Sequence, residues 1–228
     1  MHPTILYLHG FASGPDSEKG VAVARHFERE CSVRRLDLRV PTFETMLPSA
    51  MLEVTRTAIA ETPADSPVVL FGSSLGGLTA ARAAAGNDRV RGLILLAPAF
   101  GFTARWRERL GPDELAAWRA SGWLSIDDYA LRRKAQLHYA FITDAERLDR
   151  EFGPAAPAPA TPSFGSTPTL VVHGDRDDVV PVSGSIDWAR ENESVRLVRV
   201  DDGHSLTASL PVILREADAL MSAVQRGR

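Results

Sequence analysis

The sequence predicts a doubly wound α/β domain with a mostly parallel sheet. Short runs rich in apolar and β-branched residues alternate with helical stretches along most of the chain, which is the pattern of strand–helix–strand units. Most of these runs are continuously apolar, as expected for strands that are covered on both faces. The 228 residues are 44% hydrophobic and 24% charged, an ordinary composition for a globular protein with one large core. We therefore expect a single domain over residues 1–228.

The strands and helices are expected in a regular order. Apolar runs predict strands at residues 4–8, 32–38, 68–72, 91–98, 169–174 and 195–200. Helical periodicity predicts a helix over 17–27, with Val21, Ala24 and Phe27 on one face. Further helices are expected over 42–61, with a tolerable kink at Pro48, and from Leu75 onward.

Residues 100–161 interrupt this order and are expected to form a helical cap over the sheet. The segment contains three of the four tryptophans and no convincing strand pattern. Pro112 near the start and Gly122 near the end predict a helix over 111–123, and a second helix is expected over 144–152. The Pro-rich stretch 153–162 is expected to be an extended connector.

Charge and cysteine content exclude several classes of function. The formal net charge is −3 and the pI is about 6.1, so no overall basic field favours nucleic acid. No apolar run approaches the roughly 18 residues that span a membrane, and the N-terminus lacks the pattern of a signal peptide. Cys31 is the only cysteine, which excludes an internal disulfide and a multi-cysteine metal site. We expect a cytoplasmic monomer or small homo-oligomer without a metal or cofactor.

The stretch Gly72-Ser73-Ser74-Leu75-Gly76 fits the pattern G-x-S-x-G. It lies between a buried strand and a helix of small residues, which is the setting of a nucleophilic serine on a sharp turn. Ser74 is then the nucleophile, and the N–H of Leu75 at the helix N-terminus stabilises developing negative charge. The alternative is an ordinary strand-to-helix turn, in which Gly and Ser are common.

A nucleophilic serine needs a base, and the chain has six histidines. His204 follows the last strand, at the sheet edge where loops carry functional groups. His2 lies at the terminus, His26 on a surface helix and His138 in the cap. His9 and His173 both end strands, where packing or ordering of a loop is the expected role.

The acid that orients the base is expected between the serine and the histidine in the chain. The loop after residues 169–174 offers three candidates, Asp175, Asp177 and Asp178, and the residues alone do not choose among them. Near the N-terminus, Gly10 allows close approach of the backbone, so the N–H of Phe11 is expected to join that of Leu75 in an oxyanion hole.

Four motifs in this order resemble an α/β-hydrolase: "LYLHGFASGPDSEK", "LFGSSLGG", "HGDRDDVVP" and "DDGHSL". The first is similar to the start of small bacterial YqiA-like esterases. "GSSLGG", "HGDRDDVVP" and "YAFITDAERL" resemble the abhydrolase group that contains a mitochondrial acyl-protein thioesterase. The resemblance implies that the acid is the third residue after "HG", which is Asp177.

The resemblance implies a serine hydrolase that cleaves short to medium acyl esters or thioesters with the triad Ser74, Asp177 and His204. Trp106 and Trp123 either line an apolar acyl pocket or anchor the cap. Five cap arginines either form a solvated face or attract an acidic leaving group: Arg105, Arg107, Arg109, Arg132 and Arg133. The alternatives for the whole chain are a peptidase, an acyltransferase, or a binding protein that has lost catalysis.

Overall fold

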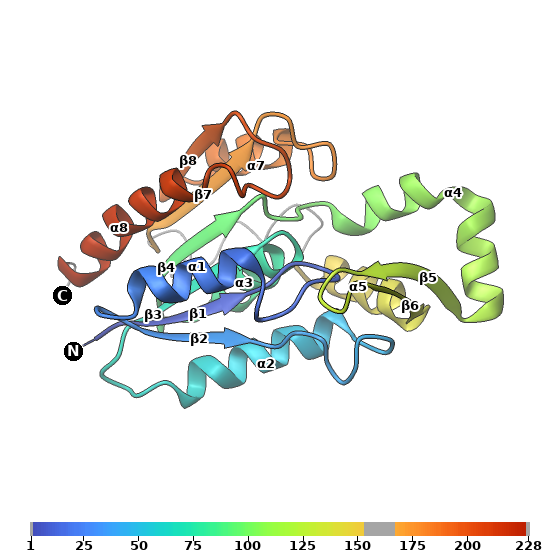
Figure 1. The fold of residues 1–228 in the computed structure, drawn as a ribbon, viewed down its shortest axis with the longest axis horizontal. Helices are drawn as coiled ribbons and strands as arrows, with labels where there is room; N and C mark the ends of the chain where they lie inside the picture. The colour runs from blue at the N-terminus through green and yellow to red at the C-terminus, as the bar shows by residue number, and fades with distance from the viewer. Residues whose placement is uncertain (1, 153–166, 227–228) are drawn as a thin grey trace.

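The computed structural model describes residues 2–152 and 167–226 (Figure 1). The predicted connector 153–162 and the end of the predicted cap at residue 161 lie outside these ranges. The core is a six-stranded sheet in the order β2-β1-β3-β4-β7-β8, and every neighbouring pair is parallel. Its strands are β1 (Thr4–Leu8), β2 (Ser32–Leu36), β3 (Val68–Ser73), β4 (Val90–Leu96), β7 (Thr169–Gly174) and β8 (Val195–Val200). The predicted parallel α/β sheet is confirmed.

Helices cover both faces of the sheet because alternate strand residues are apolar on both sides. Ile5 and Tyr7 of β1 pack in one core with α1 (Glu18–Phe27) and α8 (Leu210–Arg226). Leu6 and Leu8 pack in the other core with α2 (Pro48–Glu61), α3 (Leu75–Ala84) and α7 (Ser183–Glu191). Each fully buried Leu, Ile or Val contributes about 1.5–3 kcal/mol, so the continuous apolar strands stabilise the three layers.

Two helices differ in detail from the sequence prediction. The buried face of α1 consists of Gly20, Val23 and Phe27, so the predicted face with Val21 and Ala24 was wrong. Helix α2 begins at Pro48 rather than at residue 42. Proline has no N–H and its ring clashes with a preceding helical turn, so it suits the first turn and stops the helix from extending backwards.

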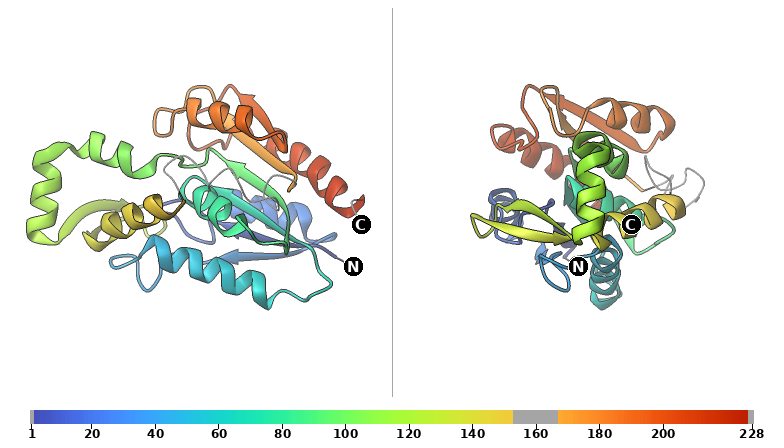
Figure 2. Two further views of the ribbon diagram at one scale, coloured as in Figure 1. Left: turned by 180° about the vertical axis from the view of Figure 1, so that it is seen from behind. Right: turned by 90° about the vertical axis from the view of Figure 1, so that its right-hand side faces the viewer.

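The cap contains a β-hairpin as well as helices. It runs from α4 (Phe102–Ser121) through β5 (Trp123–Asp128) and β6 (Arg133–His138) to α5 (Ala140–Phe152). The expectation of a cap without strands was therefore wrong. Residues of β5 alternate between exposed and partly buried over most of its length, and such half-exposed strands lack the continuous apolar run that identifies the strands of the main sheet. Figure 2 shows that the cap projects from one end of the sheet.

Aromatic packing and backbone hydrogen bonds attach the cap to the core. Phe11, in the loop after β1, packs its ring against that of Phe141 in α5 at 5.3 Å. Within the cap, Trp118 is buried and donates its Nε1–H to Leu137 O at 3.0 Å, which joins α4 to β6. Tyr129 N, in the hairpin turn, donates to Ala12 O at 2.9 Å, and His138 N donates to Glu44 O at 2.8 Å. Helix α4 bends at Gly111, where φ is 70°, and Gly122 caps its end at Ser121, close to the predicted end at residue 123. It begins at Phe102 rather than at residue 111. None of the helices in the described ranges is long and apolar enough to cross a membrane.

Candidate active site

Ser74 lies on a strained turn between β3 and α3. Its φ is 53° and its ψ is −117°, a backbone conformation that costs energy for a residue other than glycine. A Cβ on Gly72 would lie 2.5 Å from Gly76 O, and a Cβ on Gly76 would lie 2.3 Å from Leu8 O. Both positions therefore require glycine, which is the steric reason for the G-x-S-x-G pattern.

The structure brings Ser74, His204 and Asp177 together. His204 Nε2 lies 3.0 Å from Ser74 Oγ, across 130 residues of sequence, and His204 Nδ1 lies 2.8 Å from Asp177 Oδ2. Because the carboxylate only accepts hydrogen bonds, Nδ1 carries the proton and Nε2 is free to accept from the serine hydroxyl. The neighbours Asp175 and Asp178 are exposed, and Asp175 pairs with Arg199.

The Asp177 carboxylate is fully buried and surrounded by N–H donors. Oδ1 accepts from Val179 N at 2.9 Å and Val180 N at 2.8 Å. Oδ2 accepts from His204 and also lies 3.2 Å from His173 Nε2. Burial by itself raises the pKa of Asp177, but the donors of His173, His204 and Val180 outweigh it and hold the pKa well below its usual range. The group is a carboxylate at neutral pH.

The loop that carries His204 is held from both sides. The Asp202 carboxylate accepts from Gly203 N at 2.7 Å and from Ser209 N at 3.0 Å. Burial raises the pKa of Asp202, but the hydrogen bonds from Ser209 and Gly203 lower it by more, so the net shift of this pKa is downward. Lys19 Nζ donates to Ser205 O at 2.5 Å, and burial lowers the pKa of Lys19. These contacts limit the freedom of the imidazole.

The proposed oxyanion hole lies beside the serine. A Cβ on Gly10 would lie 3.4 Å from Ser74 Cβ, so the Gly10-Phe11 backbone runs next to Ser74. His9 orders this loop: its Nδ1 donates to Gly10 O at 2.9 Å and its Nε2 accepts from Leu38 N at 3.1 Å. Burial lowers the pKa of His9, which favours the neutral ring that this pattern requires. Leu75 is the first residue of α3, where backbone N–H groups lack helical partners.

The two tryptophans predicted to line a pocket lie in different places. Trp106 is partly buried, and its ring packs against that of Phe11 at 5.1 Å and against those of Trp118 and Phe141. Trp123 is 43% exposed at the start of β5, with its ring edge-on to His138 at 4.9 Å. Of the two, Trp106 is the one in contact with the predicted oxyanion loop.

The five cap arginines differ in their contacts and in their exposure to solvent. Arg107 pairs with Glu146, Arg133 lies 3.6 Å from Glu44, and Arg109 and Arg132 are exposed. Arg105 instead donates to Phe100 O, and its burial lowers its pKa while Asp177 raises it. The paired and exposed arginines fit a solvated face, whereas Arg105 lies close enough to Asp177 for the two charges to interact.

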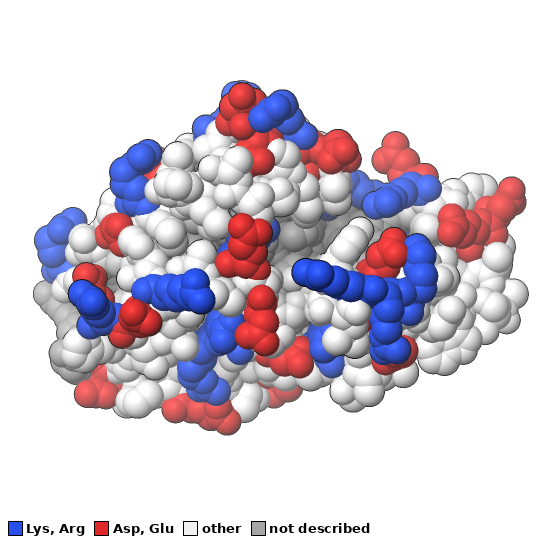
Figure 3. All heavy atoms as spheres, in the orientation of Figure 1, with Lys and Arg blue, Asp and Glu red and all other residues white. Residues whose placement is uncertain are grey.

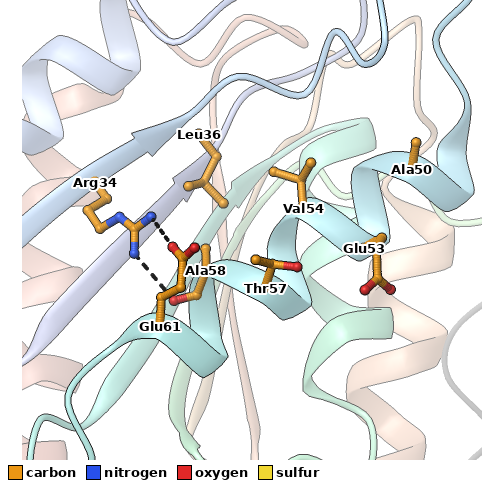
Figure 4. A pocket seen from close by; sticks show the side chains of 8 residues that line it. All are labelled: Arg34, Leu36, Ala50, Glu53, Val54, Thr57, Ala58 and Glu61. Carbon is orange, nitrogen blue, oxygen red and sulfur yellow. Dashed lines mark hydrogen bonds and ion pairs between the residues drawn. The ribbon is translucent and has the colours of Figure 1, made fainter.

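A groove of about 480 Å³ lies away from these residues, between the edge strand β2 and helix α2 (Figure 4). Leu36, Val54 and Ala58 supply apolar surface, and Arg34 pairs with Glu61 across it at 2.9 Å. The groove contains none of the predicted site residues. In the ranges that the structure describes, no three His, Cys, Asp or Glu side chains gather as a metal site.

The fold and the serine turn define the α/β-hydrolase class, which the sequence motifs predicted. The chain belongs to the uncharacterised protein family UPF0227, which matches residues 4–215. No curated protein matches the sequence.

Three solved structures show the shared fold. Alpha/beta hydrolase domain-containing protein 10 from mouse is 21% identical, with a TM-score of 0.77, over 98% of this chain and 91% of that one. Est1E from Butyrivibrio proteoclasticus, with ferulic acid bound, is 22% identical, with a TM-score of 0.76, over 97% and 88%. The alpha/beta hydrolase GrgF from Penicillium is 17% identical, with a TM-score of 0.64, over 96% and 89%.

Proposed function

We propose that this protein is a serine hydrolase that cleaves carboxylic esters or thioesters of short to medium acyl chains. The observation that supports the proposal is the hydrogen-bonded line from Ser74 through His204 to Asp177, with its two distances of 3.0 and 2.8 Å. A serine hydroxyl is a weak nucleophile, and a neutral imidazole that is oriented by a buried carboxylate is the arrangement that activates it.

The reaction proceeds in two halves through an acyl-enzyme. Ser74 Oγ attacks the carbonyl carbon while His204 Nε2 takes its proton. The N–H groups of Phe11 and Leu75 stabilise the oxyanion of the tetrahedral intermediate. His204 then gives the proton to the leaving alcohol or thiol, and the acyl group stays on Ser74. His204 Nε2 then takes a proton from a water molecule, whose oxygen attacks the acyl carbon. When the bond from that carbon to Ser74 Oγ breaks, His204 returns the proton to Ser74 Oγ and the acid is released.

The acyl chain is proposed to lie against Trp106, because that ring contacts Phe11 and belongs to the apolar cluster of the cap. Each methylene buried there contributes about 0.8 kcal/mol. Figure 3 shows that the surface is hollowed between the β7–β8 part of the molecule and the cap. Peptide cleavage or acyl transfer would use the same three residues.

The test is the pair of variants Ser74→Ala and Ser73→Ala. Ser74→Ala is expected to lose at least about 10³-fold in kcat on p-nitrophenyl butyrate, because only binding and oxyanion stabilisation remain. It is also expected to lose covalent labelling by a fluorophosphonate probe. Ser73→Ala, next to it on β3, is expected to keep both. Labelling of Ser74→Ala, or its loss in Ser73→Ala, refutes the assignment of the nucleophile.

A panel of acyl esters, thioesters and peptide esters then identifies the reaction. Hydrolysis of the esters and thioesters without the peptides supports the proposal. Absence of both labelling and hydrolysis in the unaltered protein would favour a binding protein with a hydrolase fold.

A further inference from the structure

A second histidine contacts the same carboxylate oxygen of the acid as the base does. His173 is on β7, one residue before the strand ends, and it is fully buried. Its Nε2 lies 2.8 Å from Val180 O and 3.2 Å from Asp177 Oδ2. Its Nδ1 lies 2.7 Å from the hydroxyl of Ser185, which is itself buried in the first turn of α7.

These partners determine the tautomer of His173. A backbone carbonyl only accepts hydrogen bonds, so Nε2 must carry a proton. In the neutral ring Nδ1 then accepts, and the Ser185 hydroxyl donates to it. The Nε2–H donates to Val180 O at 2.8 Å, and Asp177 Oδ2 lies in electrostatic contact with the same nitrogen at 3.2 Å. The same carboxylate oxygen accepts the Nδ1–H of His204 at 2.8 Å, so two protonated imidazole nitrogens lie close to one oxygen.

We propose that His173 is a positioning residue that, held by Ser185, orients the Asp177 carboxylate and takes up part of its negative charge. The inference rests on the proposed function, because it concerns the acid of that triad. The site then contains a continuous chain of contacts through five side chains: Ser74, His204, Asp177, His173 and Ser185. The sequence predicted for His173 a role in packing or in ordering the loop. Its position four residues before Asp177 was the signal for the more specific role.

The charge on Asp177 affects the basicity of His204. A carboxylate oxygen that accepts fewer hydrogen bonds carries more negative charge towards the imidazole, and this stabilises the imidazolium. Loss of the His173 donor should therefore stabilise the imidazolium form of His204 further and move the acid limb of the kcat/KM profile to higher pH. A role in packing alone would lower kcat/KM without moving that limb.

Two substitutions of His173 separate its two contacts. The amide nitrogen of Gln is the same number of covalent bonds from Cβ as Nε2, whereas that of Asn corresponds to Nδ1. His173→Gln thus keeps a donor for Asp177, and His173→Asn reaches Ser185 only. We expect His173→Asn to lose about 10- to 100-fold in kcat/KM, the effect of removing one hydrogen-bond donor from a charged group. Its acid limb should rise by about half a pH unit or more.

His173→Gln is expected to recover most of the activity and to keep the acid limb of the unaltered protein. Ser185→Ala is expected to lose activity without a shift of the limb. His26→Gln is the matched control, because His26 forms a surface pair with Asp218 at 2.7 Å, and it should change neither quantity. An unshifted limb in folded His173→Asn, or a raised limb in His173→Gln, overturns the proposal.

A spectroscopic measurement on the unaltered protein keeps the test independent of how the variants fold. With histidine labelled with nitrogen-15, NMR should show His173 protonated at Nε2 and unprotonated at Nδ1. A ring protonated only at Nδ1 cannot donate to Asp177 and overturns the proposal. Labelling of the unaltered protein by the fluorophosphonate separates the two hypotheses: without labelling the proposed function fails, and with labelling and an unmoved limb only the role of His173 fails.

Discussion

Asp177→Asn tests the environment of the acid most directly. Each oxygen of the carboxylate faces donors only: the N–H groups of Val179 and Val180 on one side, and the two imidazoles of His204 and His173 on the other. An amide has one oxygen and one NH₂ group, so it cannot accept on both sides. The N–H groups of Val179 and Val180 can only donate hydrogen bonds. The amide oxygen in the variant Asp177→Asn should therefore face these two groups.

The NH₂ group of Asn then faces His204. To accept from it, His204 must move its proton from Nδ1 to Nε2, and in that tautomer Nε2 cannot take the proton of Ser74. The fold is expected to survive because the backbone contacts are kept. We expect kcat to fall by about 10⁴-fold, the loss typical of the wrong tautomer in such a triad, which corresponds to about 5 kcal/mol of transition-state stabilisation.

The assay is the steady-state hydrolysis of p-nitrophenyl butyrate at neutral pH, with circular dichroism as the check on folding. The matched controls are Asp175→Asn and Asp178→Asn. Both residues are exposed in the same loop, and both variants should keep most of the activity. The reasoning is refuted if folded Asp177→Asn retains more than about a tenth of kcat, or if Asp178→Asn is the inactive variant.

Three further predictions follow from packing and charge. Gly76→Ala should lose about 1–3 kcal/mol of unfolding free energy in urea, since the new Cβ would lie 2.3 Å from Leu8 O. In the control Gly184→Ala the nearest contact of the new Cβ would be at 3.7 Å, so the unfolding free energy should change little. Catalytic efficiency should rise from acetyl to medium acyl chains and then fall, and Trp106→Ala should flatten the rise without abolishing acetyl ester turnover. Folding lowers the pKa of Asp177, so its stabilisation is present above its unfolded pKa of about 4 and is lost as pH falls further. The difference in unfolding free energy between the unaltered protein and Asp177→Asn should therefore shrink below about pH 4.

The sequence by itself determined the features that depend on local chemistry. Continuous apolar runs identify the buried parallel strands, because such strands are covered on both faces. The pattern of Gly72, Ser74 and Gly76 identifies the sharp turn, because a side chain at Gly72 would collide with Gly76 O, four residues further along the chain. These constraints act between neighbours or on whole segments, so they are readable without the fold.

Only the tertiary structure decided which side chains meet. The strand order places β7 beside β4 and β4 beside β3, which brings the loops with Asp177 and His204 to the turn with Ser74. Within the first loop, Asp177 faces inward because Val179 N and Val180 N bind its carboxylate, while Asp175 and Asp178 face the solvent. The sequence pattern of the cap did not reveal its hairpin, and residue type did not reveal that His173 contacts the acid. Such contacts depend on the direction of each side chain and on segments that are far apart in the chain, and local patterns encode neither.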